Sequence, residues 1–155
     1  MENSGKFLWV KQFGSSEFDE GKTLRVNSKN DLIIGGDFSS LIYFDEIPLS
    51  SNGITDAFIA CLDQEGNTKW AFANGSVKYD ACLTLTTDLN NNIYYSGKFQ
   101  NSISINEKTL YSNGFTDIFL IKYSPEGIIQ WSTSYGNSGQ DEPFSIISNK
   151  MMKFF

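Results

Sequence analysis

The chain has 155 residues, with 12 basic and 18 acidic side chains, a formal charge of −6 and no histidine. No cluster of Lys or Arg is present, which argues against nucleic acid as a partner. No apolar run approaches the roughly 18 residues of a membrane-spanning helix, so we expect no membrane insertion. The lack of histidine excludes Ser-His-Asp and Cys-His catalysis and histidine-based metal sites.

The chain is an array of repeats. Its three tryptophans, Trp9, Trp70 and Trp131, lie 61 residues apart, and residues 5–65 align with residues 66–126 without a gap, with 20 identical positions. A third, partial unit covers residues 127–155. We therefore interpret residues 1–155 as one segment of about two and a half repeats of 61 residues.

Short apolar or alternating runs, each closed by a turn signal, predict four β-strands in each unit and no helix. In the first unit an apolar run follows Asp31. Residues 41–49 form an insert after this run, and Pro48 in the insert argues against a strand in the middle of the sheet. A hairpin formed by residues 103–105 and 109–111 is its counterpart in the second unit. The strands predicted in the second unit are residues 68–73, 82–87, 93–99 and 118–123.

Four antiparallel strands repeated with one large aromatic residue per unit are typical of β-propeller blades, so the predicted class is all-β. A single sheet of this size cannot bury both faces, and neighbouring blades must stack. Two and a half units are too few to close a ring, which predicts an open arc or part of a larger propeller. The exposed ends of such an arc favour self-association or docking of the remaining blades.

Several motifs resemble the bacterial β-propeller repeat family abbreviated SBBP. They are the segment from Asp88 to Phe99 (D-L-N-N-N-I-Y-Y-S-G-K-F), the segment from Asn113 to Tyr123 (N-G-F-T-D-I-F-L-I-K-Y) and the E-G-I-I-Q-W run that ends at Trp131. The resemblance covers residues 5 to about 147. It implies a propeller that is one part of a larger cell-surface or secreted protein, without a common enzymatic activity and without catalytic residues.

The two ends of the chain depart from this pattern. Residues 1–5 contain neither a basic region nor an apolar stretch, so no signal peptide is expected, whereas the resemblance suggests an extracellular or cell-envelope location. Residues 151–155 replace the turn residues found at 90–94, and the sequence therefore predicts that the chain stops inside a strand.

Most of the repeated residues have an expected structural role. An aspartate in a Ser/Gly-rich turn can accept hydrogen bonds from backbone N–H groups and hold the turn, although the same acids are the best candidates for a carboxylate-based catalytic site. The tryptophans are expected to pack between strands, with stacking on a sugar as the alternative. The expected structural residues are Trp9, Trp70, Trp131, Gly14, Gly75, Gly136, Asp19, Asp80 and Asp141.

Two further patterns have a simple interpretation and a chemical one. Asp88, Asn90 and Asn92 resemble the start of a calcium loop, but the glycine and glutamate of the full signature are missing, so an Asn-rich hairpin turn is the preferred reading. Cys61 and Cys82 occupy non-equivalent positions of the repeat and are expected to be free thiols, with a disulfide left open.

Three function classes follow from these observations. The leading one is a non-catalytic protein-binding or scaffold module, with the partner unknown and no cofactor. The second is a carbohydrate-binding propeller, for which Tyr94 and Asn113 are candidate ligand residues. The third is a carboxylate-dependent enzyme that uses Asp80 and Asp141, which are also weak candidates for binding.

Overall fold

The computed structural model describes residues 8–148, and every regular element in this range is a β-strand. None of the elements in this range is a helix that could cross a membrane. The strands are β1 (Asp19–Val26), β2 (Leu32–Phe38), β3 (Leu41–Phe44), β4 (Ile47–Ser50), β5 (Asp56–Leu62), β6 (Thr68–Asn74), β7 (Asp80–Thr87), β8 (Ile93–Phe99), β9 (Ser102–Ile105), β10 (Lys108–Tyr111), β11 (Asp117–Tyr123) and β12 (Ile129–Tyr135).

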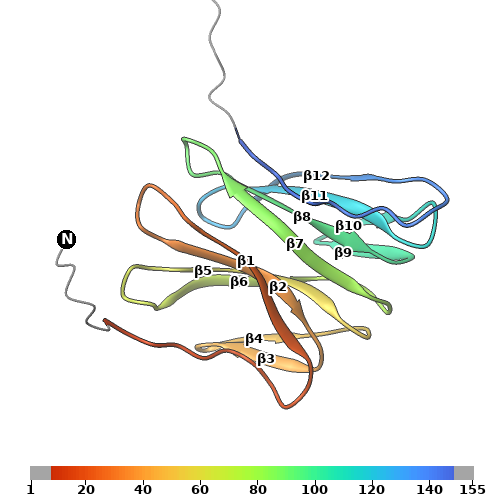
Figure 1. Cartoon of the computed structure of the whole chain (residues 1–155). Coiled ribbons are helices and arrows are strands. Elements are labelled where there is room, and N and C mark those ends of the chain that lie inside the picture. The colour runs from red at the N-terminus through yellow and green to blue at the C-terminus, as the bar shows by residue number, and fades with distance from the viewer. Residues whose placement is uncertain (1–7, 149–155) are drawn as a thin grey trace, which may run out of the picture.

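The strands form two equivalent antiparallel sheets, each with a small hairpin. The first blade has the strand order β1-β2-β5-β6 and the second has the order β7-β8-β11-β12. In chain order, the hairpins β3–β4 and β9–β10 are inserted between the second and third strands of their blades, and each forms a separate two-stranded sheet. Figure 1 shows the two blades as separate stacked sheets. The all-β propeller-blade prediction is confirmed, and each predicted strand of the second unit lies within an observed one.

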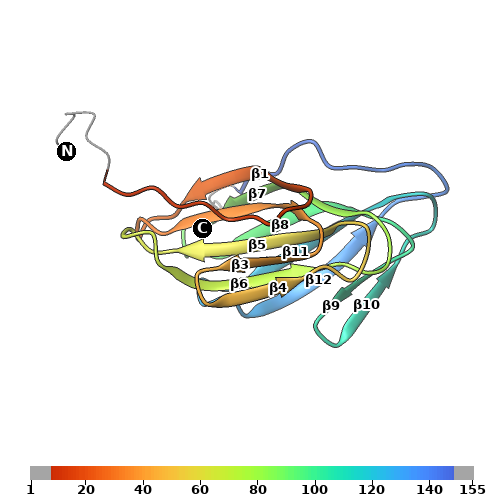
Figure 2. The same ribbon diagram turned by 90° about the horizontal axis from the view of Figure 1, so that it is seen from below.

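The blades converge along one edge and diverge along the other. Strand β7 of the second blade packs across β1, β2 and β5 of the first, whereas the outer strand β6 lies farther from the second blade and meets it through β9 and through large side chains such as Tyr123 on β11. Figure 2 shows the strands of both blades from below, with the hairpins at the diverging side. Hairpin β9–β10 therefore fills the space between the outer strands β6 and β12. Because the blades are farther apart at this edge, successive blades are arranged around an axis.

The main core lies between the two blades, because each sheet buries one face against the other. Its largest fully buried side chains are aromatic: Tyr95, Phe99, Phe119 and Tyr123 come from the second blade. A second core lies on the opposite face of the first blade, under hairpin β3–β4. Phe13 from the N-terminal segment closes this core by stacking on Phe44, with 4.6 Å between the ring centroids.

The sequence repeat and the structural blade are out of phase. Gly66, the first residue of the second unit, lies in the turn between β5 and β6, so the outer strand of each blade belongs to the next unit. The described residues therefore contain two complete blades, 19–74 and 80–135, flanked by segments 8–14 and 141–148. The expectations for residues 1–5 and 151–155 lie outside the described residues.

Candidate functional site

The two ends of the blades are built differently. At one end the strands are joined by short turns at residues 27–31, 63–67, 88–92 and 124–128. At the other end, loops precede β1, β5, β7 and β11, and the connections that lead to β5 and β11 also contain the hairpins β3–β4 and β9–β10. We call these the turn end and the loop end. Loops held on a rigid scaffold are where binding residues concentrate, so the loop end is the better candidate for function.

The turn end contains the segment with a partial calcium signature. The carboxylate of Asp88 accepts hydrogen bonds from the backbone N–H groups of Asn90 and Asn92, both at 2.9 Å, and from the Asn92 side chain at 2.8 Å. Although desolvation opposes it, this hydrogen bonding lowers the pKa of Asp88. The carboxylate thus faces the donors of its own turn, which is the geometry of an Asx turn. No metal-binding group of three His, Cys, Asp or Glu side chains occurs within residues 8–148.

At the loop end, aspartates anchor the loops in a repeated way. Asp80 accepts a hydrogen bond from the backbone N–H of Ser76 at 2.7 Å, four residues before it, and Asp56 accepts one from Asn52 at 3.0 Å. The same bond forms in the other copies of these loops, at Asp19 with Ser15, Asp117 with Asn113 and Asp141 with Asn137. The structure therefore places the predicted acids Asp19, Asp80 and Asp141 as loop anchors.

The repeated glycines make room for these anchors. A Cβ atom on Gly75 would lie 2.4 Å from the Asp56 carboxyl carbon, and one on Gly136 would lie 2.3 Å from that of Asp117. Real Cβ atoms do not approach carboxyl carbons this closely. Gly14, the third member of the set, lies against Asp19, where a Cβ would be 3.3 Å from a carboxylate oxygen.

Loops of neighbouring blades are joined to each other by backbone hydrogen bonds. The N–H of Ile54 donates to the carbonyl of Lys78 at 3.2 Å, and the N–H of Asp80 donates to that of Thr55 at 3.0 Å. The second blade repeats this arrangement, since the N–H of Asp141 donates to the carbonyl of Thr116 at 2.9 Å. The loop end is consequently a continuous platform across both blades.

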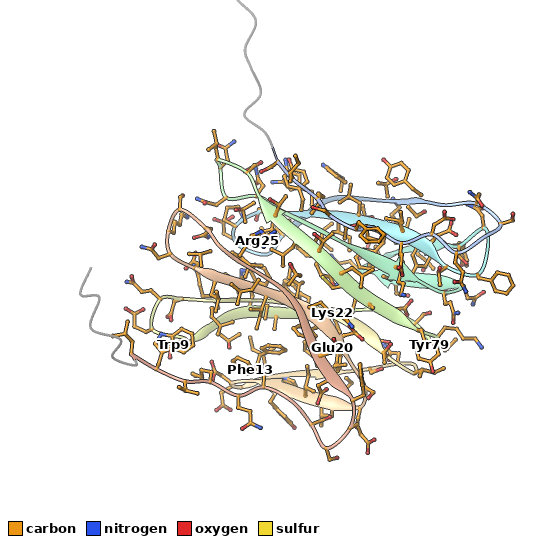
Figure 3. The ribbon with its side chains drawn as sticks, in the orientation of Figure 1. Trp9, Phe13, Glu20, Lys22, Arg25 and Tyr79 are labelled. Atoms are coloured by element: carbon orange, nitrogen blue, oxygen red, sulfur yellow. The ribbon has the colours of Figure 1, made fainter. Side chains whose placement is uncertain are left out.

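A cleft of about 500 Å³ opens in this platform between the blades. Its floor carries side chains of both charges, among them Lys22, Asp37 and Lys98, and its rim carries the half-exposed aromatic side chains of Phe18 and Tyr79. Figure 3 shows Lys22 and Glu20 together on β1 and Tyr79 beside the start of β7.

The charged group in the cleft is built around the buried Asp37. This residue is 5% exposed, its Oδ1 lies 3.6 Å from Lys22 Nζ, and Oδ1 has no hydrogen-bond donor. Burial raises the pKa of Asp37 to about 6, and the charge of Glu20 adds to this effect while Lys22 opposes it. The cleft thus holds a carboxyl group with an unused acceptor oxygen at the boundary of two blades.

Sequence reasoning did not identify this cleft, because none of its charged residues belongs to a repeated motif. One signal was present: Glu20 and Lys22 align with Ala81 and Leu83, and Asp37 aligns with Lys98. Residues needed by the scaffold recur in each unit, whereas these charges occur at positions where the repeat breaks. Positions at which the residue differs between the two repeats were therefore a better indicator of a candidate site than positions at which it is identical.

Two of the tryptophans, Trp9 and Trp70, link their segments to a turn farther along the chain. The indole N–H of Trp9 donates to the carbonyl of Gln64 at 2.9 Å, and that of Trp70 donates to the carbonyl of Pro125 at 3.2 Å. Both rings lie against a glycine of the turn, Gly66 or Gly127, whose positive φ of 84° or 81° keeps the site free of a side chain. Trp70 is 8% exposed, which confirms that it is buried.

The two sequence candidates for sugar binding do not form one site. Tyr94 is at the start of β8 and its hydroxyl reaches Asp88 at the turn end, whereas Asn113 lies at the loop end and donates to Asp117. Asp80 is also at the loop end but is fully buried. The structure therefore keeps Tyr94 and Asn113 as two separate candidates at opposite ends of the blade.

The cysteines are separate, buried thiols. Cys61 and Cys82 are both free, so the disulfide that the sequence left open does not form. Burial raises the pKa of Cys61 to about 11 and raises that of Cys82 well above its ordinary value. These thiols are therefore packing residues of the inter-blade core.

Stacked four-stranded antiparallel blades with a repeated tryptophan define a β-propeller-type repeat protein. No family model matches the chain. The chain is similar to an uncharacterized WD repeat-containing protein of Acanthamoeba polyphaga mimivirus, with 29% identity over an alignment that covers 87% of this chain. It spans only 11% of the length of that relative. The similarity supports a propeller-type repeat and is not specific to the bacterial SBBP family.

Proposed function

We propose that this chain is a non-catalytic β-propeller module that binds a protein partner at its loop end. The observation that supports it best is a set of exposed apolar side chains around the polar cleft. Exposed apolar side chains that gather in one place mark protein-interaction sites, and aromatic residues are enriched in such interfaces. The set consists of Phe18, Ile54, Val77 and Tyr79.

The rigidity of the platform also supports this proposal. The aspartate anchors and the bonds between loops fix the backbone on which Tyr79 and Phe18 are presented. A pre-organised surface loses little entropy on binding, which favours affinity. Propellers with WD repeats generally serve as scaffolds for protein binding, and the similarity to such a protein is consistent with that role.

The experiment compares proteins retained by the immobilised chain and by two variants. Tyr79→Ala removes a rim side chain, and Leu89→Ala removes an apolar side chain at the turn end that is more exposed still. We expect a partner that the chain and Leu89→Ala retain and that Tyr79→Ala loses. Cross-linking followed by mass spectrometry should place that partner on residues 51–55 and 76–79. Equal retention by both variants, or cross-links at the turn end, would contradict the proposal.

A carbohydrate ligand is a second candidate, which the cleft supports better than Tyr94 and Asn113 do. Lys22 can donate a hydrogen bond to a sugar hydroxyl, the buried Asp37 beside it holds Lys22 in place, and Tyr79 offers a ring face at the rim. On a glycan array, binding that is lost in Asp37→Asn and Tyr79→Ala but kept in Leu89→Ala would support this alternative. Absence of glycan binding by the unaltered chain would exclude it for the glycans on the array.

The non-catalytic part of the proposal rests on burial. The Asp80 carboxylate has no exposed surface and is occupied by the N–H groups of Ser76 and Gln100. A substrate could not contact it without opening the loop. The finer assignment to the SBBP family, and the cell-surface or secreted location that it implies, is also part of this proposal and rests on the motifs alone.

A further inference from the structure

The third tryptophan lacks the contact that the other two make. Trp131 on β12 is 41% exposed, and within residues 8–148 its indole N–H finds no acceptor. The one aromatic ring that it meets within residues 8–148 is Tyr94, edge to face, with 6.0 Å between centroids. Trp9 and Trp70 each donate to a carbonyl in a turn that contains a glycine with positive φ. Trp131 has the same indole N–H donor, but within residues 8–148 no such turn lies opposite it.

Trp131 belongs to the face of the second blade that points away from the first, which we call the outward face. The register places Trp131 beside Lys122 and Lys122 beside Tyr94 across this face. In the first blade the equivalent positions are Trp70, Cys61 and Ile33, and there they are buried against the second blade. The outward face therefore repeats the positions with which the first blade holds its neighbour.

The outward face also carries a charge that identifies its complement. Lys98, which also lines the cleft at the loop end, forms an ion pair with Glu142 of the C-terminal segment at 2.7 Å. Glu142 lies 61 residues after Ala81, which in turn lies 61 residues after Glu20. Glu20 on β1 is thus the residue that a first blade would bring to the same place, and its side chain is half-exposed beside Lys22, with which it forms an ion pair within its own chain. Opposite charges at matched positions favour docking in this register.

Within residues 8–148, each outer face of the blade pair is met by a single segment without a strand. Residues 141–148 lie on the outward face through Glu142 and through the Ser148 hydroxyl, which bonds to Thr87, but they form no strand there. Phe144 in this segment is 96% exposed. At the other end, residues 8–14 hold Trp9 in its turn, again without a strand. A complete blade carries a backbone ladder and a full apolar face, which neither segment supplies.

We propose that the outward face binds the first blade of a second copy of this chain. Trp131 enters the turn of residues 63–66 of the second copy in place of that copy's Trp9, donates to the carbonyl of Gln64 and covers Gly66. Lys98 pairs with Glu20 of the second copy in place of Glu142. Each copy then adds two complete blades to a head-to-tail stack in which segments 8–14 and 141–148 are displaced.

Light scattering across a range of concentrations tests this directly. The average mass should rise above the 17.4 kDa of one chain as the concentration increases. Trp131→Ala removes the central aromatic contact and should raise the midpoint concentration of assembly at least about tenfold. A mass of one chain at every concentration, or unchanged assembly of Trp131→Ala, would overturn the proposal.

A charge exchange tests the register of docking independently of the folding of each variant. Lys98→Glu and Glu20→Lys should each weaken assembly, because each places like charges together. The double variant Lys98→Glu/Glu20→Lys should regain assembly close to that of the unaltered chain. Failure of the double variant to regain it, with circular dichroism showing intact sheets, would overturn the assignment. Tyr79→Ala tests the separate proposal for the loop end and should leave the mass unchanged.

Discussion

The phenolic oxygen of Tyr123 on β11 accepts a hydrogen bond of 3.2 Å from the side-chain amide of Asn74 on β6, and both residues are buried. This bond crosses from the second blade to the first. Tyr123 also lies parallel to the indole of Trp70, with 6.2 Å between ring centroids. The outer part of the inter-blade core is therefore joined by one polar contact within an aromatic stack.

The variant Tyr123→Phe should lower the free energy of unfolding by about 1 to 3 kcal/mol, because it leaves the amide of Asn74 buried without its partner. Urea denaturation measures this change. Tyr111→Phe is the matched control, since Tyr111 is exposed on hairpin β9–β10 and should be neutral. Equal stability of Tyr123→Phe and the unaltered chain would show that Asn74 has another partner or reaches water.

The variant Trp70→Ala should lower the free energy of unfolding by about 3 to 5 kcal/mol, the range for removing a large aromatic side chain from a core. The control Trp131→Ala removes the same side chain from a position that is largely open and should cost much less. The comparison should be made at a concentration where the chain is monomeric. Similar losses for the two variants would contradict the different burial of the two indoles.

Much of the fold was predictable, because turn and strand signals recur with the 61-residue period. The hairpin at residues 103–111 and the strand at residues 93–99 follow directly from local patterns. The strand at which each blade begins was not evident, since a blade built from a repeated sequence can begin at any strand of the repeat. That β6 completes the first blade depends on pairing between Ala57 and Asn74, which local patterns do not encode.

The candidate site was less predictable than the fold. Asp37 lies on a strand, and its importance comes from burial between two blades, which depends on how β7 packs across β2. Tyr94 and Asn113 were linked by their chemistry alone, and the length of strand β8 separates them. Residue type indicates what a side chain can do, but the stacking of the blades decides which side chains meet.

The variant Gly75→Ala should be destabilised by about 1 to 3 kcal/mol, because its Cβ would collide with the anchoring carboxyl group of Asp56. Gly21→Ala is the matched control. A Cβ on Gly21 would meet no atom within 4 Å, so this change should lie within about 0.5 kcal/mol of neutral. Thermal or urea unfolding of both variants measures the difference. A neutral Gly75→Ala would mean that the loop can shift without loss of the Asp56 bond.

The thiols of Cys61 and Cys82 should not react with a colourimetric disulfide reagent at neutral pH. Both are buried, and their raised pKa values keep them protonated, whereas the thiolate is the reactive form. In concentrated denaturant, two thiols per chain should react rapidly. Fast reaction of either thiol in the folded protein would show that the blades separate readily.

The last prediction concerns the pH dependence that Asp80 gives to stability. Burial, reinforced by the charge of Asp56, raises the pKa of Asp80 to about 7, whereas the ordinary value in an unfolded chain is about 3.9. Between these two values the folded chain holds a proton that the unfolded chain releases. The contribution of Asp80 to stability therefore falls as the pH rises from about 4 to about 7, and it is constant outside that interval.

The variant Asp80→Asn removes this titration and keeps one oxygen that can accept the N–H of Ser76. The free energy of unfolding of the variant, relative to the unaltered chain, should increase by at least about 1 kcal/mol between pH 4 and pH 7, because one unit of pKa corresponds to 1.36 kcal/mol. Urea denaturation at several pH values gives this difference, in which the effects of the other acids cancel. A difference independent of pH would show that Asp80 is ionised in the folded chain throughout this interval and that its two backbone hydrogen bonds offset the effect of burial.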